Sequence, residues 1–140
     1  PLTRALRVSK AILAGLQATL LHYLKGEALE QIPVWRMIAM DIAEIERRAV
    51  ELAQHLNDGG TQAEVIDGFS AVGGGSLPGE TLATRLVAVH VSAPHELAER
   101  LRLGSVPVIG RIEQDTFLLD LRTVLPAEEA TLRRALEAAL

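Results

Sequence analysis

The sequence predicts an α+β fold: a small antiparallel or mixed sheet with helices on one face. Helix-like and strand-like segments follow one another in the order helix, helix, strand, strand, helix, hairpin, helix. Most strand-like segments are joined without the long crossovers that parallel strands need. The 140 residues are 49% apolar but only 3% aromatic. They can therefore form one core of ordinary domain size, built mainly from aliphatic side chains.

The first predicted helix covers residues 7–24 and is apolar on more than one face. Its leucines recur at three- and four-residue spacings, yet further apolar residues fall between them. A helix that is apolar all round is usually buried on several sides. The chain also begins without methionine, which we interpret as a piece of a larger protein. We expect residues 1–30 to be an interdomain helix region linking to an absent large domain, and residues 31–140 to be a small C-terminal α+β domain.

A second helical region is predicted to begin at residues 32–34, and within it an amphipathic helix whose apolar residues, from Ile38 to Leu56, alternate four- and three-residue steps. Asp41 and Glu44 have the spacing of a capping box at its start. The charged residues around Arg47 and Arg48 are expected mostly on the solvated face. An Asn-Asp-Gly-Gly run ends the helix.

The remaining segments predict the sheet and two more helices. Residues 62–72 and 84–91 are strand-like, and residues 94–103 follow as a helix opened by proline. Two short apolar runs, 107–112 and 117–121, flank a four-residue polar stretch and predict a hairpin with a loop longer than two residues. A last helix is predicted over the C-terminal residues from Ala127.

Composition excludes several classes of function. The formal net charge of −4 argues against electrostatic binding of nucleic acid by the chain as a whole. Cysteine is absent, and the four histidines lack zinc-binding spacings, so no metal site is predicted. No apolar run approaches the ~20 residues that cross a bilayer. We therefore expect no membrane segment and a cytoplasmic location.

Two features are candidates for a site. Arg4 and Arg7 lie three residues apart, on one face of a helix, where two guanidiniums could clamp a phosphate or sulfate. By itself, this spacing favours two solvated arginines at the start of a helix over an anion clamp. The segment Gly73-Gly74-Gly75-Ser76 matches neither a Walker A loop nor a dinucleotide fingerprint, so a wide strand connection and a close approach of backbone to a ligand both stay open. The chain shows no self-contained catalytic set, which predicts part of an active site or a binding module.

Six segments of the chain together form one ordered set of motifs. They are PLTRALRVSK (1–10), LQATL (16–20), IPVWRM (32–37), VGGGSLPG (72–79), PVIGRI (107–112) and LLDLRTV (118–124). In this order they resemble the carboxy-terminal part of the bacterial selenocysteine synthase family, the L-seryl-tRNA(Sec) selenium transferases. The likeness spans nearly the whole chain.

The resemblance implies the small domain of a fold-type I pyridoxal-phosphate enzyme that converts seryl-tRNA(Sec) to selenocysteyl-tRNA(Sec) with selenophosphate. The cofactor lysine would lie upstream of Pro1, so the chain alone is expected to be inactive. Arg4 and Arg7 match arginines thought to hold the phosphate-like end of the selenium donor, and Arg111 is a further candidate for substrate contact. The role of the segment from Gly73 to Ser76 stays unassigned.

The family also implies a large homo-oligomer. Two alternatives remain open at this point: the small domain of a related pyridoxal-phosphate-dependent lyase, and an assembly or binding module without chemistry of its own.

Overall fold

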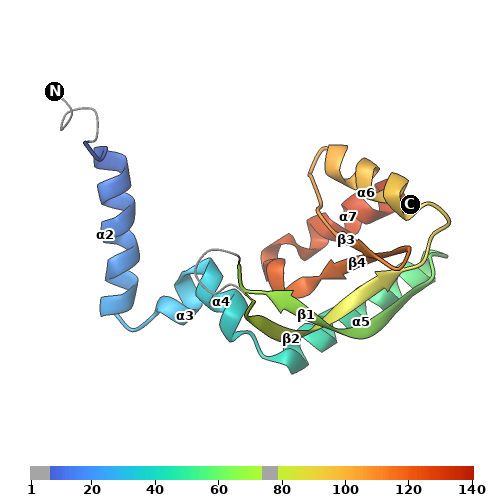
Figure 1. Ribbon diagram of the computed structural model, residues 1–140, viewed down its shortest axis with the longest axis horizontal. Helices are drawn as coiled ribbons and strands as arrows, with labels where there is room; N and C mark the ends of the chain where they lie inside the picture. Colours follow the sequence, from blue (N-terminus) through green and yellow to red (C-terminus); the bar gives the residue numbers. More distant parts are fainter. Residues whose placement is uncertain (1–6, 74–78) are drawn as a thin grey trace. The chain divides into compact units, whose positions relative to one another are not determined.

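A computed structural model describes residues 7–73 and 79–140 of the chain (Figure 1). It divides into two compact units, Pro1–Ala39 and Met40–Leu140. The expected boundary between an interdomain helix region, residues 1–30, and a C-terminal domain, residues 31–140, stays a prediction. No helix among the described residues is both long enough and apolar enough to span a membrane.

The first unit consists of helices in its described part. They are α2 (Lys10–Leu24), α3 (Ala28–Gln31) and α4 (Pro33–Ala39). Helix α2 starts three residues later than predicted, because the Ser9 hydroxyl accepts a hydrogen bond from the Ile12 N–H at 3.3 Å and so caps the helix. Gly26, at φ +75°, follows its end. None of residues 7–39 is buried.

The second unit is an α+β layer, which confirms the predicted fold class. Its elements are α5 (Ile42–Asp58), β1 (Ala63–Ala71), β2 (Thr81–Val89), α6 (Pro94–Leu103), β3 (Arg111–Glu113), β4 (Thr116–Asp120), the 3₁₀ turns η1 (Leu121–Thr123) and η2 (Pro126–Glu128), and α7 (Glu129–Ala139). The strand order is β1-β2-β4-β3, and every pairing among the described strands is antiparallel.

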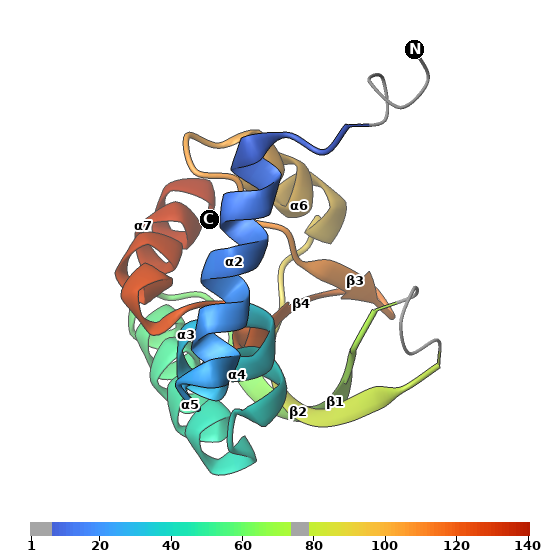
Figure 2. The same cartoon turned by 90° about the vertical axis from the view of Figure 1, so that its left-hand side faces the viewer.

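The main core lies between one face of the sheet and helices α5, α6 and α7 (Figure 2). Alternate residues of the central strands supply the sheet's share, among them Val87, Val89, Phe117 and Leu119. The opposite face carries a smaller cluster of Leu86, Ala88 and Leu118, with Ile66 packed against it. The period of two along each strand explains this division of side chains between faces.

The β3–β4 hairpin has a tighter turn than predicted. Glu113 pairs with Thr116, so only Gln114 and Asp115 form the loop. Both have positive φ, +48° and +58°. These angles are typical of a type I′ turn, whose twist matches that of the flanking strands. The expected four-residue loop is therefore wrong, because its outer residues join the ladder.

The second predicted helical region is divided into α4 and α5, and within α5 one arginine differs from expectation. Asp41 caps the helix through the Ala43 N–H at 2.9 Å, as predicted, while Glu44 pairs with Arg47. Arg47 is exposed, but Arg48 is buried at 1% exposure. The expectation that both arginines are solvated is wrong for Arg48.

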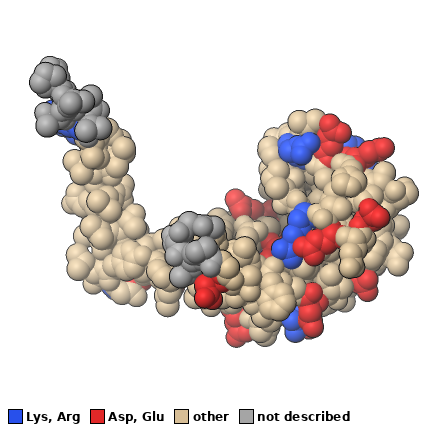
Figure 3. All heavy atoms as spheres, viewed as in Figure 1, with Lys and Arg blue, Asp and Glu red and all other residues tan. Residues whose placement is uncertain are grey.

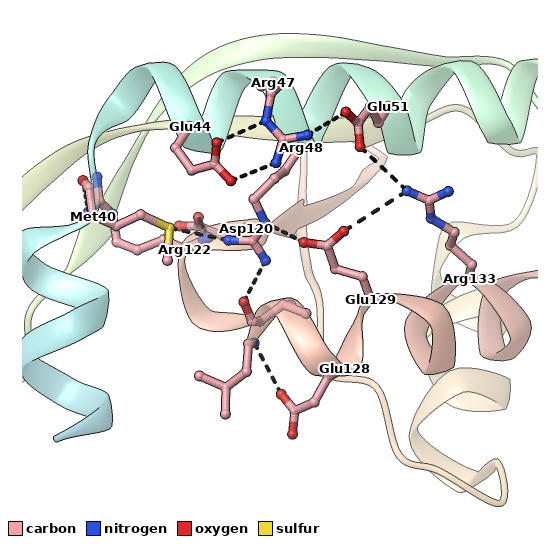
Figure 4. Close-up of polar contacts among 12 residues, drawn as sticks. Met40, Glu44, Arg47, Arg48, Glu51, Asp120, Arg122, Glu128, Glu129 and Arg133 are labelled. Carbon is pink, nitrogen blue, oxygen red and sulfur yellow. Dashed lines mark hydrogen bonds and ion pairs between the residues drawn. The ribbon is translucent and has the colours of Figure 1, made fainter. Parts of the chain in front are cut away.

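Arg48 is buried because it joins distant segments of the second unit (Figure 4). Its Nε lies 2.5 Å from the Glu129 carboxylate, and its Nη2 donates to the Val124 carbonyl at 2.6 Å. A further contact reaches the Met40 sulfur at 3.2 Å. These partners compensate the desolvated guanidinium, which would otherwise be costly to bury.

Candidate functional site

Of the two arginines predicted to bind an anion, Arg4 lies outside the described residues. Arg7 lies just before α2 and is exposed. It lines an open hollow with Val8, Ser9, Lys10 and Leu13. No carboxylate among residues 7–73 and 79–140 forms an ion pair with Arg7, and α2 has no acid in its first turn.

The chemistry of this hollow suits an anion. Arg7 and Lys10 supply two cationic side chains, and the N-terminal end of α2 adds the positive end of its dipole. A guanidinium offers a planar fork of donors, whereas an ammonium acts as a point charge. Arg7 and Lys10 therefore place positive charge at the predicted anion clamp. No acidic residue among those described pairs with Arg7.

The predicted glycine-rich segment extends from the end of the β1–β2 hairpin. Gly74, Gly75 and Ser76 lie outside the described residues. Gly73 has φ +130°, a conformation that favours glycine. The Val72 N–H donates to the Glu80 carbonyl at 3.2 Å, so the ladder continues to the residue before Gly73.

Arg111 lies on β3, at one edge of the sheet, and its guanidinium is engaged within the chain. Its Nη1 donates to the Phe69 carbonyl on β1 at 3.0 Å. Its Nε lies 3.0 Å from the Glu113 carboxylate. The structure thus brings Arg111 to the end of β1 that leads to Gly73, whereas Arg7 belongs to the other unit. A contact between Arg111 and substrate stays a prediction.

A second arginine, Arg85, lines the same hollow on the sheet as Arg111. Its Nη1 lies 2.6 Å from the Asp67 carboxylate and its Nε lies 3.5 Å from that of Glu46. Both guanidiniums of this hollow are therefore compensated by carboxylates. The local charge is balanced, in contrast to the surroundings of Arg7.

A buried polar cluster around Asp120 was missed by the sequence analysis. The Asp120 carboxylate accepts hydrogen bonds from Ser70 Oγ at 2.5 Å, Thr84 Oγ1 at 3.0 Å and the Arg122 N–H at 3.0 Å. Arg122 is 5% exposed and donates to the Ala83 carbonyl at 2.6 Å. The available signal was two charged residues alternating with leucines, which is unusual for a solvated strand end.

The described residues do not form a cradle for pyridoxal phosphate. Lys25 is largely exposed and lies 3.5 Å from Glu27, and Lys10 is exposed at the start of α2. Neither lysine is enclosed beside groups that could hold a phosphate and a pyridine ring together. We therefore assign no step of cofactor chemistry to these residues.

Comparison with known proteins agrees with the sequence pattern. Residues 1–125 match the family model of L-seryl-tRNA selenium transferase. A relative from Carboxydothermus hydrogenoformans, named L-seryl-tRNA(Sec) selenium transferase, is 40% identical over 98% of this chain and 30% of its own length. Relatives of the same name from Geobacter sulfurreducens and Nitratidesulfovibrio vulgaris are 41% and 42% identical, over 89% and 100% of this chain.

The chain spans 28–31% of the length of these three relatives. The match nevertheless covers the first unit and residues 40–125 of the second, and it includes Arg7, Gly73 and Arg111. Residues 1–125 far exceed half of the 140-residue chain. The chain therefore belongs to the L-seryl-tRNA selenium transferase family.

Proposed function

We propose that this chain is the carboxy-terminal part of a pyridoxal-phosphate-dependent L-seryl-tRNA(Sec) selenium transferase. The whole protein would replace the hydroxyl of seryl-tRNA(Sec) by selenium from selenophosphate, in the cytoplasm where tRNA is used. The observation that carries this proposal is the family match over residues 1–125, together with relatives of that name at about 40% identity.

In this proposal Arg4 and Arg7 hold the phosphate-like end of the selenium donor. Support comes from the exposed position of Arg7, the neighbouring Lys10 and the lack of an acid in the first turn of α2. A donor that carries several negative charges would gain charge-assisted hydrogen bonds from these groups.

The remainder of the protein would hold pyridoxal phosphate, which supplies an electron sink for the exchange at the serine side chain. The cofactor lysine is proposed to lie upstream of Pro1. The isolated chain is therefore expected to lack activity. The contribution of this chain is to bind the donor and to orient it toward the tRNA-linked serine.

The surface of α2 supports a second, compatible role in contacts with the rest of the protein. Its apolar side chains are exposed on several faces; Ile12 and Leu24, for example, are 64% and 83% exposed. Apolar area of this extent is typical of a surface that another structure covers. We propose that residues 1–30 link this chain to a large domain, which covers the apolar side chains of α2, and that the assembled enzyme is a homo-oligomer.

The donor-binding role is tested by Arg4→Ala and Arg7→Ala in the full-length protein. We expect selenium transfer to fall roughly ten- to a hundredfold, since a charge-assisted hydrogen bond contributes ~1.5–3 kcal/mol. Binding of seryl-tRNA(Sec) should change far less. Arg102→Ala is the matched control, because Arg102 is exposed on α6. An equal loss of transfer and tRNA binding would contradict the role.

A further inference from the structure

We propose that Arg111 is a positioning residue: it joins β3 to the free edge of β1 and so fixes the end of the β1–β2 hairpin that leads to Gly73. This inference rests on the proposed function only where it concerns selenium transfer. Its structural part stands on the contacts of Arg111 itself. It differs from the contact with substrate that the family resemblance suggests for this residue.

The two strands that Arg111 joins are the outer strands of the sheet. The order β1-β2-β4-β3 places β1 at one edge and β3 at the other. The sheet is strongly curved (Figure 2), and the Arg111 Nη1 reaches the Phe69 carbonyl at 3.0 Å. One side chain on β3 thus contacts backbone on β1, although two strands separate them in the hydrogen-bonded order.

The register pairs Phe69 with Ala83 on β2, but as a pair that exchanges no backbone hydrogen bonds. The bonds from His90 N to Gln62 O and from Val72 N to Glu80 O belong to the same ladder. Residues of β1 with even numbers therefore exchange backbone hydrogen bonds with β2, and those with odd numbers face the free edge. Arg111 donates to an outward carbonyl that β2 cannot satisfy, and so it partly closes this edge.

The apolar core holds only one end of β1. Ala63 and Val65, at its start, pack in the main core. Phe69, near its end, is 64% exposed. Two side-chain contacts add to the β1–β2 ladder at this second end: Ser70 Oγ to the Asp120 carboxylate at 2.5 Å, and Arg111 to the Phe69 carbonyl. Loss of Arg111 therefore removes one of the side-chain contacts that add to the β1–β2 ladder near Gly73.

Local packing aligns the guanidinium for this contact. The Glu113 carboxylate lies 3.0 Å from the Arg111 Nε, on the same strand. A Cβ added at Gly68 would lie 3.7 Å from the Arg111 Nη2, an ordinary van der Waals distance, so the guanidinium lies directly beside β1. The guanidinium thus makes an ion pair with Glu113 and a hydrogen bond to the Phe69 carbonyl, whereas a lysine ammonium lacks the planar fork.

The test compares Arg111→Gln and Arg111→Lys in the full-length protein by amide hydrogen exchange. We expect the Val72 amide, at the end of the hairpin next to Gly73, to exchange roughly fivefold faster in Arg111→Gln, since one hydrogen bond that resists local opening is lost. The His90 amide, at the opposite end of the β1–β2 ladder, should exchange at an unchanged rate. Arg111→Lys should be intermediate, and Arg102→Gln on α6 serves as the charge-matched control. Unchanged exchange at Val72 would overturn the proposal.

Kinetics separate positioning from direct contact. For a positioning role, kcat of selenium transfer falls in Arg111→Gln, KM for selenophosphate stays constant, and Arg111→Lys recovers part of kcat. A raised KM with unchanged exchange at Val72 would show direct contact and overturn the proposal. Faster exchange with unchanged kcat would overturn its functional part. If the unaltered protein transfers no selenium, the proposed function fails, while the exchange result still decides the role of Arg111.

Discussion

Helices α2 and α5 are of similar length and have opposite relations to a core. Helix α2 has 15 residues, none of them buried, whereas α5 has 17 residues, six of them buried. On the face drawn in Figure 3, α2 is almost free of charge, while acidic and basic side chains are spread over residues 40–140. The more apolar helix is thus the more exposed one. Within the described residues, the single apolar face of α5 packs in the main core, whereas the several apolar faces of α2 remain exposed.

The contacts of the two units differ in range as well. In the first unit, polar contacts are local, such as His22 Nδ1 to the Glu27 carboxylate at 2.8 Å and the Trp35 indole N–H to the Tyr23 hydroxyl. In the second unit, Arg48 and Glu129 are 81 residues apart in sequence. The second unit therefore depends on interior contacts that form only when the whole layer assembles.

The largest expected effect concerns the two adjacent arginines of α5. Arg48→Ala should lower the free energy of unfolding by about 3–5 kcal/mol, because it removes one partner of a largely buried ion pair. Arg47→Ala is the matched control and should change stability little, since Arg47 pairs with Glu44 and Glu51 on the exposed side of the same helix. Urea unfolding followed by circular dichroism measures both. Similar losses for the two variants would contradict the contrast between interior and surface pairs.

A smaller loss is expected at Gly110, in the PVIGRI segment. An added Cβ would lie 2.4 Å from Phe117 Cζ and 2.8 Å from the Leu118 carbonyl oxygen. Phe117 is fully buried, so it has little room to move. Gly110→Ala should cost about 1–3 kcal/mol of stability in the same unfolding experiment. Gly15→Ala on α2 is the control, because nothing lies within 4 Å of its added Cβ; a neutral result at Gly110 would mean that β3 shifts freely.

The exposed face of α2 can be tested with Ile12→Gln in the full-length protein. If a large domain covers this helix, as proposed, the variant should lose about 1–2 kcal/mol of stability through lost apolar burial. Gln17→Ala, on the same helix, should be close to neutral. A neutral Ile12→Gln would indicate that α2 stays solvated in the whole protein and would contradict the proposed covering domain.

The smallest effect concerns the end of α2. A hydrogen bond from His22, aided by the charge of Lys25, lowers the pKa of Glu27 below its ordinary value of 4.5. Because the folded pKa is the lower one, this pair stabilises the turn above pH 4.5 and the contribution is lost as pH falls through the folded pKa. Carboxyl shifts in NMR spectra should titrate below 4.5, and His22→Ala should move the midpoint upward. An unmoved midpoint would exclude His22 as the main cause.

Much of the fold followed from local patterns. The amphipathic stripe of α5, the start of α6 at Pro94 and the strand-like run that became β2 were all predicted. The burial of Arg48 was not, because a charged residue beside Ala49 on the apolar stripe is normally solvated. The site was predicted less well: Arg111 was singled out, but the carbonyl that it contacts lies 42 residues away.

The sequence by itself determined the fold class, the family and the candidate residues Arg4, Arg7 and Arg111. These depend on periodicity and on motifs along the chain, which a single sequence carries directly. Only the tertiary structure decided that Arg48 is buried against Glu129, that Asp120 gathers Ser70 and Thr84, and that Arg111 meets the free edge of β1. The physical reason is that partners for desolvated charges come from distant strands and helices, so sheet order, register and curvature select them.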